Sequence, residues 1–490
     1  MNGVSEPVAA SSLPAFGRRF LDGEDSITRI GEGAIGGKAA GLVHADRIIR
    51  ERFSDGRAFG LEIGVPRMLV IATDVFDDFV EQNDLRRLAE TDESDEQIAE
   101  AFLQAAIPAD IVGDLRSLIN GVRQPLAVRS SSMLEDSLSQ PFAGVYATKM
   151  IPNNQPSADQ RFRLLTDAIK LVWASTYLSP ARHYAAATGH KPADEKMAVI
   201  IQEVVGERFD ERFYPVVSGV ARSYNFYPTG RMKPQDGVVN LALGLGKTIV
   251  DGEVSWPYCP RYPQLAPPST VRELIDRAQQ KYWAVNMGKP PAFDPIAEAE
   301  YLVQTDLKAA DMDDTLYLVA STYDPANDRL VLGTTAAGPR VVNFARLTQL
   351  GEPPVNDVIA SMLEVCEDAL GEQVEIEFAV TIDTNRPTRA RFGFLQLRPM
   401  MVSTEAITIS DEELNSTEAL AVSERALGNG AIDSIQDIVY VNPDTFDKKY
   451  TTQIAGELAE INKSLHADDT PYVLIGFGRW GSSDPWLGIP

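Results

Sequence analysis

Cysteine and histidine are scarce in this chain, and neither forms a metal-binding pattern. The 490 residues include two cysteines, Cys259 and Cys366, which lie far apart and outside any CxxC motif. The four histidines show no HExxH or HxH spacing. Zinc sites and disulfide frameworks depend on such patterns, so a metal held by nitrogen or sulfur is not expected. A hard cation held by oxygen ligands stays open.

Long apolar runs and targeting signals are also missing. No window of 18 uninterrupted apolar residues occurs, so the sequence predicts no transmembrane helix. The first residues, MNGVSEPVAASSLP, lack the basic and apolar regions of a signal peptide. Together with the few unpaired cysteines, these features predict a cytoplasmic protein without a membrane partner.

Basic residues are few relative to acidic ones. Lys and Arg number 45 against 70 Asp and Glu, which gives a formal net charge of −25 at pH 7. Such a surface repels phosphate backbones, so non-specific nucleic-acid binding is not expected. A small anionic ligand would need a site that gathers the scarce cations locally. The hydrophobic fraction of 44% is enough for sizeable folded cores, and the length is typical of about three domains.

Helical and strand periodicities alternate along the chain, which predicts an α+β protein. Residues 162–172 carry apolar side chains at helical spacing, whereas 197–205 form a continuous apolar run typical of a buried strand. Residues 1–25 are small and polar and predict a flexible lead-in. After residue 402 the composition changes, and residues 403–490 predict a small C-terminal α/β extension of unknown role. The apolar end at Ile489-Pro490 suggests a truncated piece of a longer protein.

A glycine-rich stretch precedes the first long predicted helix. Gly31, Gly33 and Gly36 fit G-x-G-x-x-G, which indicates either a dinucleotide site, and hence an NAD-dependent oxidoreductase, or a flexible glycine turn. Gly36, Gly37 and Lys38 offer another interpretation, because glycines allow a close approach and a helix N-terminus favours an anion. Lys38 would then contact a phosphate, unless it is an ordinary surface lysine. The later GLGKT at 244–248 lacks the first glycine of a P-loop.

A serine-rich loop follows a short predicted strand. Residues 125–129, PLAVR, deliver Arg129 into Ser130-Ser131-Ser132. A guanidinium matches phosphate oxygens in a bidentate manner, so Arg129 is a candidate phosphate ligand. The alternative is an ion pair of Arg129 with Glu135 or Asp136.

Two glutamates and an arginine belong to a predicted hairpin over 374–398. Glu375 and Glu377 share one face of a strand and lie roughly 6–7 Å apart, a spacing that suits oxygen-ligated cations. A hairpin centred between residues 386 and 387 would place Gln396 opposite Glu377 and Arg398 opposite Glu375. The alternative is an ordinary half-exposed hairpin with cross-strand ion pairs.

The order of these motifs resembles the N-terminal nucleotide-binding domain of the phosphoenolpyruvate synthase and pyruvate phosphate dikinase family. The resemblance covers about residues 26–402 and implies an ATP-grasp-like fold with lobes at 26–205 and 206–402. It rests on the following segments: IGGKAAGL at 35–42, VPRMLVIAT at 65–73, LAVRSSSMLEDSLSQPFAGVYAT at 126–148, MAVIIQEVVG at 197–206, VSGVA at 217–221, LALGLGKTIVDGEVS at 241–255, VEIEFAV at 374–380 and FLQLRPM at 394–400.

The resemblance implies ATP and Mg²⁺ as ligands and assigns roles by position. The cofactor-binding residues would be Gly36, Gly37, Lys38, Arg129, Gln202, Glu203, Val204 and Arg398, with residues 202–204 as the adenine hinge. Glu375, Glu377 and Gln396 would organise magnesium. Arg129, Glu377, Gln396 and Arg398 would act in catalysis. The family often has Asp at the position of Glu375 and an acidic residue at that of Lys247, and residues 256–355 match it poorly.

The implied activity is phosphoryl transfer from Mg-ATP by a kinase-type or dikinase-type phosphotransferase. No segment resembles the family's Thr-x-His phosphohistidine signature, so the acceptor, a phosphohistidine domain or another group, would come from another segment or chain. A nucleotide-sensing module that binds ATP without turnover is the alternative.

Overall fold

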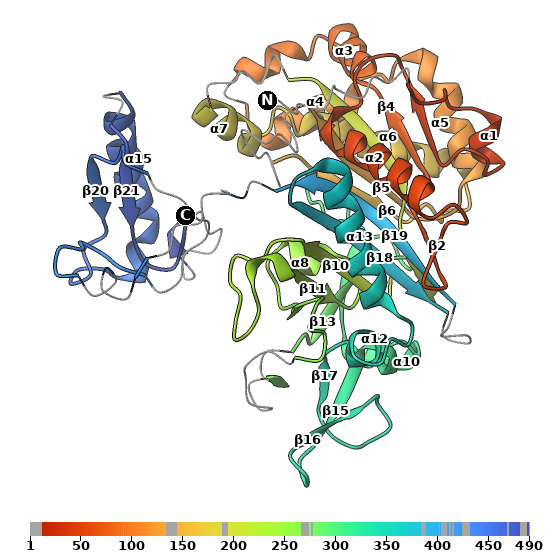
Figure 1. Ribbon diagram of the computed structural model, residues 1–490. Helices are drawn as coiled ribbons and strands as arrows, with labels where there is room; N and C mark the ends of the chain where they lie inside the picture. The colour runs from red at the N-terminus through yellow and green to blue at the C-terminus, as the bar shows by residue number, and fades with distance from the viewer. Residues whose placement is uncertain are drawn as a thin grey trace. The chain divides into compact units, whose positions relative to one another are not determined.

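The computed structural model describes residues 12–91, 93–133, 145–188, 195–265, 274–275, 278–383, 389–400, 402, 409–410, 413, 416–423, 432–467, 470–480 and 488–489. The chain divides into two compact units, Met1–Met401 and Val402–Pro490 (Figure 1). Helices and strands are mixed throughout the first unit, which confirms the α+β prediction. No helix of the described residues is both long and apolar enough to cross a membrane.

The first sheet is mostly antiparallel. Its strands lie in the order β1 (Ile27–Ile30), β4 (Met68–Ile71), β7 (Met197–Glu203), β5 (Leu126–Ser132) and β6 (Thr148–Ile151). Only the pair β1 and β4 is parallel. The glycine fingerprint therefore does not lie in the doubly wound parallel sheet of dinucleotide-binding folds, which removes the structural support for the NAD interpretation.

Helices cover one face of this sheet. They are α1 (Arg18–Leu21), α3 (Thr73–Gln82), η2 (Arg86–Glu90), α4 (Asp95–Gln104), α5 (Ala109–Gly121), α6 (Ala158–Ala174) and α7 (Ser179–Thr188). Leu69 and Ile71 of β4 pack into the core on this side, whereas Met68 and Val70 pack into the core on the other side. Burial of both faces explains why the strands read as continuous apolar runs rather than alternating ones.

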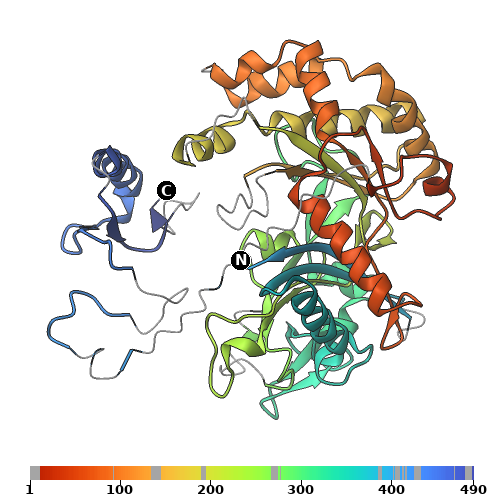
Figure 2. The ribbon, with the colours of Figure 1, turned by 45° about the horizontal axis from the view of Figure 1, so that its top comes forward.

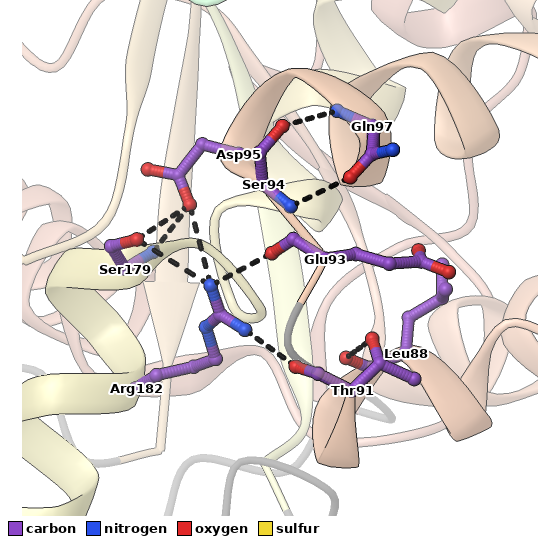
Figure 3. Close-up of polar contacts among 8 residues, drawn as sticks. All are labelled: Leu88, Thr91, Glu93, Ser94, Asp95, Gln97, Ser179 and Arg182. Carbon is purple, nitrogen blue, oxygen red and sulfur yellow. Dashed lines mark hydrogen bonds and ion pairs between the residues drawn. The ribbon is translucent and has the colours of Figure 1, made fainter.

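Polar contacts fasten α7 to the start of α4 (Figure 3). Ser179, the first residue of α7, donates from its backbone N–H and its hydroxyl to Oδ1 of Asp95, both at 2.8 Å. Arg182 donates to the carbonyl oxygens of Thr91 at 2.8 Å and Glu93 at 3.2 Å. The side chain of Arg182 thus fixes the segment before α4 by binding the backbone carbonyl groups of that segment.

The second sheet combines strands from both halves of the first unit. Its order is β12 (Trp256–Tyr258), β11 (Val238–Ala242), β10 (Val217–Arg222), β18 (Val374–Ile382), β19 (Ala390–Pro399), β3 (Leu61–Gly64) and β2 (Arg57–Ala58). Strands β2 and β3 lie within 26–205, the predicted first lobe, yet β3 pairs with β19 of the predicted second lobe, and β2 pairs with β3. The second sheet therefore contains two strands from before residue 205, whereas all strands of the first sheet lie before that residue.

Two long helices pack against the second sheet, α2 (Gly36–Arg52) and α13 (Val355–Leu370). Figure 2 shows the red-orange α2 running alongside the blue strands β18 and β19. Close packing here requires Gly41, because a Cβ at this position would lie 2.4 Å from the carbonyl oxygen of Leu397 in β19. The glycine of α2 thus permits the contact between the helix and the strand that carries the predicted site residues.

Smaller sheets complete the first unit. The third has the order β14 (Leu302–Asp306), β13 (Lys281–Asn286), β9 (Arg212–Tyr214) and β8 (Glu207–Phe209), and the fourth has β16 (Arg329–Leu332), β15 (Ala320–Asp324) and β17 (Arg340–Val342). The short helices between strands are η4 (Pro234–Asp236), α8 (Lys247–Val250), α10 (Leu307–Met312), α11 (Leu316–Val319) and α12 (Ala345–Thr348).

The second unit contains a parallel strand pair joined by a helix. Strands β20 (Asp437–Tyr440) and β21 (Tyr472–Ile475) pair in parallel, and η5 (Lys448–Tyr450) and α15 (Thr451–Ala467) lie between them in the chain. A second short pair is formed by β22 (Arg479–Trp480) and β23 (Gly488–Ile489).

Candidate functional site

A cavity of about 610 Å³ in the first unit is lined by strands of the first, second and third sheets. The predicted site residues that line it are Lys38, Arg129, Gln202, Glu203, Val204, Glu375, Glu377, Gln396 and Arg398. Segments that are hundreds of residues apart in the sequence thus contribute to one concave surface. Concave sites with a few converging polar groups are typical of ligand-binding pockets.

Arg129 links the two sheets at this cavity. Its side chain leaves β5 of the first sheet, and its Nη1 donates to the carbonyl oxygen of Leu395 in β19 at 2.7 Å. Nη2 donates to Oε1 of Gln396 at 3.0 Å and lies 3.9 Å from Oε2 of Glu377. The alternative partners Glu135 and Asp136 lie outside the described residues. The guanidinium is therefore fixed by the second sheet while it lines the cavity.

The β18–β19 hairpin has the predicted register next to the site. Glu375 is opposite Arg398 and Glu377 is opposite Gln396. Immediately beyond Glu377 the register shifts, so that Leu395 is an additional residue on β19. Such a β-bulge leaves its residue outside the regular ladder. The carbonyl of Leu395 is the group that accepts from Arg129, so the bulge creates the contact between the sheets.

Glu375 is held by two arginines. Its Oε1 accepts from Nε of Arg398 at 2.7 Å and also pairs with Nη2, while its Oε2 pairs with Nε of Arg222. The Glu375 side chain is only 5% exposed, whereas Arg222 and Arg398 are 35% and 28% exposed. Sequence reasoning did not find Arg222. Only the pairing of β10 with β18 places it opposite Glu375.

The start of α2 is fixed to the end of β5. Ser131 donates from its hydroxyl to the carbonyl oxygen of Ile35 at 2.8 Å and accepts from the N–H of Ala39 at 3.0 Å. A Cβ on Gly36, which has a φ of +74°, would lie 1.9 Å from the carbonyl oxygen of Ser131. Lys38 donates to the hydroxyl of Ser130 at 3.2 Å and lines the cavity.

Gly36 and Gly37 themselves do not line the cavity. The geometry of Gly36 explains its presence without a ligand, because no other residue could approach Ser131 so closely with this backbone conformation. We therefore assign Gly36 to the docking of the helix, which in turn positions Lys38.

Gln202 lines the cavity and carries a buried donor that has no partner in the described part of the chain. Its side chain is only 2% exposed, and its Nε2 has no hydrogen-bond partner among the described residues. Its Oε1 accepts from Arg129 at 3.4 Å. Buried polar groups are nearly always paired, so this orphan donor is a candidate contact for an acceptor on a bound molecule.

Glu203 and Val204 use their backbone amides within the protein. Glu203 donates from its N–H to the carbonyl oxygen of Arg67 at 3.0 Å, and Val204 donates to that of Pro125 at 2.9 Å. The carboxylate of Glu203 also accepts from Nε of Arg67 at 3.1 Å. A base bound at these residues would therefore meet carbonyl groups and side chains rather than these two amides.

A buried lysine secures one wall of the cavity. Lys149 donates to the carbonyl oxygen of Ala297 at 2.6 Å and pairs with Glu300 at 2.7 Å. Burial lowers the pKa of Lys149, and the Glu300 carboxylate opposes this effect. The neighbouring Thr148 N–H donates to Oε1 of Glu298 at 2.9 Å. These contacts hold residues 294–300 in place and bring Glu298 to the cavity.

Lys247 is another cationic residue that lines the cavity. Sequence reasoning assigned it no role, because the GLGKT segment that contains it is not a complete P-loop. It begins α8 and pairs with Asp251 at 2.8 Å. Its ammonium lies 5.7 Å from the ring centroid of Trp283, within the range of a cation–π contact. Lys247 and Asp251 both line the cavity as an ion pair.

Residues 32–418 match the family model of the pyruvate phosphate dikinase AMP/ATP-binding domain. The chain belongs to this family. The resemblance found in the sequence is thereby confirmed, and the described site residues all lie within the matched region. No curated protein matches the chain. The Phe142-Ala143-Gly144 element of the resemblance lies outside the described residues.

Magnesium, which the family resemblance implies, fits Glu377 better than Glu375. Glu377 is 27% exposed, and its carboxylate lines the cavity. Mg²⁺ commonly binds one or two carboxylates together with phosphate oxygens of the substrate. Glu375 does not fit this role, because both of its oxygens pair with guanidinium groups. Among the described residues, no group of three His, Cys, Asp or Glu side chains could hold a metal.

Proposed function

We propose that this chain is a phosphotransferase module that transfers a phosphoryl group from Mg-ATP to an acceptor not on this chain. One observation carries the proposal. The cavity gathers five cationic side chains, among them Lys38 from α2, Arg129 from β5 and Arg398 from β19, beside five carboxylates, in a chain with 45 Lys and Arg against 70 Asp and Glu. The lining is therefore richer in cations than the chain as a whole, as a polyphosphate ligand requires.

The cavity also offers room for a nucleoside. Its apolar lining includes Met150, Val204, Leu245, Ile249 and Leu302. These side chains can pack against the faces of a base, and the Nε2 of Gln202, which has no partner among the described residues, would donate to an acceptor atom of the nucleotide. A nucleotide enclosed between residues of separate sheets would correspond to an ATP-grasp-like arrangement of two lobes.

Phosphoryl transfer depends mainly on positioning and on compensation of negative charge. Lys38 and Arg129 would bind phosphate oxygens, and Arg129 is prevented from rotating away by Leu395 and Gln396. Glu377 would hold Mg²⁺, which supplies charge neutralisation at the phosphates when bound. Gln396, whose Oε1 accepts from Arg129, would maintain the orientation of that guanidinium.

The acceptor is proposed to come from another segment or chain, such as a phosphohistidine domain. His44 and His183 are the described histidines of the first unit, and neither lines the cavity. His44 is half-buried in α2 and bonded to Arg47, with 2.8 Å between Nδ1 and Nη2. Incubation with ATP labelled separately at the β- and γ-phosphates is expected to leave no acid-labile label on the chain. Stoichiometric label on a histidine would contradict the proposal.

Calorimetry with ATP and NAD tests the ligand class. We expect saturable ATP binding that strengthens with Mg²⁺, and no NAD binding at the same concentration. Failure to bind ATP would contradict the proposed function. Formation of ADP or AMP in the presence of candidate acceptors then tests the transfer step.

A nucleotide-sensing module that binds ATP without turnover is the second candidate. The observation that favours it is the pairing of Glu375 with two arginines. Of the two glutamates Glu375 and Glu377, only Glu377 would then be available to hold a cation for phosphoryl transfer. ATP binding without conversion to ADP or AMP under any acceptor condition would support this candidate over the first.

A further inference from the structure

We propose that Arg222 is an anion-binding residue that acts together with Arg398 on a phosphoryl group in the cavity. In this arrangement Glu375 is a positioning residue that orients both guanidinium groups. The inference rests on the proposed nucleotide-binding function and deepens it, since neither the sequence motifs nor the family match assigns a role to Arg222.

The three residues form a row across neighbouring strands. Arg222 is opposite Glu375 in the pairing of β10 with β18, and Glu375 is opposite Arg398 in the pairing of β18 with β19. The carboxylate therefore lies between two arginines, and each of its oxygens pairs with a different one. All three residues line the cavity.

The exposure of the row separates it from an ordinary structural ion pair. In the pair of Lys149 and Glu300 both side chains are almost completely buried, at 4% and 3% exposed. In the row, by contrast, the carboxylate is buried but Arg222 is 35% exposed. A guanidinium has five N–H donors, and Glu375 engages Arg222 at Nε. The remaining part of this side chain can contact a ligand.

The charge balance of the row favours an anion. Two guanidinium groups pair with the one carboxylate of Glu375, so positive side chains outnumber negative ones within the row. Arginine groups match phosphate oxygens in geometry as well as in charge. A phosphoryl group would add negative charge to the row and use donors of Arg222 that Glu375 does not occupy.

The row of Arg222, Glu375 and Arg398 lies two residues along β18 from Glu377, the residue near Arg129. Glu375 and Glu377 are two residues apart on the same strand, which corresponds to about 6–7 Å. Arg129 is close to Glu377, whereas Arg222 pairs with Glu375. An extended chain of phosphates can reach both levels, so we infer that the contribution of Arg222 increases with the number of phosphates on the nucleotide.

Calorimetry of Arg222→Ala with adenosine, AMP, ADP and ATP tests this inference. We expect ATP affinity to fall about ten- to a hundredfold, with a smaller loss for AMP and no loss for adenosine. Arg208→Ala is the matched control, because Arg208 is exposed on β8 and does not line the cavity.

Titration with inorganic phosphate separates the two sources of the phosphoryl group. A loss seen only with inorganic phosphate would assign the row to a second, phosphorylated substrate.

The outcomes distinguish this inference from the proposed function. If the wild-type chain binds no ATP, the proposed function fails. If the wild type binds ATP and Arg222→Ala binds every tested anion equally well, the role of Arg222 is overturned. If Arg222→Ala does not fold, Arg222→Lys decides. It keeps the charge but loses the planar fork, so we expect weaker ATP binding with unchanged adenosine binding, and equal ATP binding would overturn the proposal.

Glu375→Gln tests the positioning role separately. We expect this variant to bind ATP more weakly than the wild type. The Mg²⁺ concentration at which half of the gain in ATP affinity is reached should be the same in both proteins, because Glu375 orients arginines and does not hold the metal. If the variant loses the Mg²⁺ effect as Glu377→Gln is expected to do, Glu375 is a metal ligand and the positioning role is wrong.

Discussion

The Nη1 group of Arg129 donates to the carbonyl oxygen of Leu395 at 2.7 Å, across 266 positions of sequence. This contact joins β5 of the first sheet to the bulge in β19 of the second sheet. The arginine proposed to bind phosphate is therefore also part of the structural connection between the sheets. A change at this residue is expected to affect both ligand binding and stability.

Arg129→Ala is expected to weaken ATP binding about ten- to a hundredfold and to lower the free energy of unfolding by about 1–3 kcal/mol. The second effect arises because Leu395 and Gln396 lose a partly buried donor. Calorimetry and urea denaturation measure the two effects. Arg116→Ala serves as a control, since this arginine pairs with Asp159 at an exposed position. Lower stability with unchanged ATP affinity would show that Arg129 is purely structural.

Glu377→Gln is expected to remove most of the increase in ATP affinity that Mg²⁺ produces. The neutral amide loses the charge that attracts the cation, while the side chain keeps its size. ATP titrations with and without excess chelator measure this increase. Glu298→Gln is the matched control, because it neutralises another carboxylate of the same cavity. Equal ATP affinity of the wild type with and without chelator would refute the metal assignment.

Gln202→Leu is expected to weaken adenine-nucleotide binding with little effect on the stability of the free protein. Removal of a buried donor that has no partner relieves a desolvation cost, which offsets the loss of the 3.4 Å bond from Arg129, so the free energy of unfolding should stay within about 1 kcal/mol of the wild-type value. Thermal melting and calorimetry together measure both effects.

Gln279→Leu is the matched control for that substitution. Gln279 is also buried, but its side chain makes 2.9 Å bonds to the N–H and carbonyl of Leu243 and to the carbonyl of Lys281. Its replacement should destabilise the protein by about 2–4 kcal/mol, since backbone groups lose their partners. Similar destabilisation by both substitutions would contradict the distinction between a ligand-binding glutamine and a structural one.

His44 is expected to make stability depend on pH below about 6.5. Burial and, to a lesser extent, the nearby Arg47 lower the pKa of His44 in the folded state. The unfolded chain then binds more protons between the two pKa values, so the free energy of unfolding rises with pH through this window and levels off above it. Melting temperatures from pH 5 to 8 should rise less steeply in His44→Gln. An unchanged slope would assign the dependence to other groups.

The sequence alone determined the local parts of the site. Alternation in VEIEFAV and FGFLQLRP placed Glu375, Glu377, Gln396 and Arg398 on a hairpin, and the predicted pairs occur in the structure. The period of two in a strand makes such a prediction reliable, because a shift by one residue would turn every apolar side chain away from the core. The serine loop and the glycines before Lys38 likewise marked segments that reach or position the cavity.

Only the tertiary structure decided which side chains meet. The bulge at Leu395 leaves no periodic signal, yet it supplies the carbonyl that holds Arg129. The pairing of β10 with β18 brings Arg222 to Glu375, so that this carboxylate pairs with Arg222 as well as with Arg398. The contacts of Arg129 with Leu395 and of Arg222 with Glu375 join residues more than 150 positions apart. Local propensity and hydrophobic period specify elements and faces, but strand neighbours across such distances are set by the packing of the whole unit.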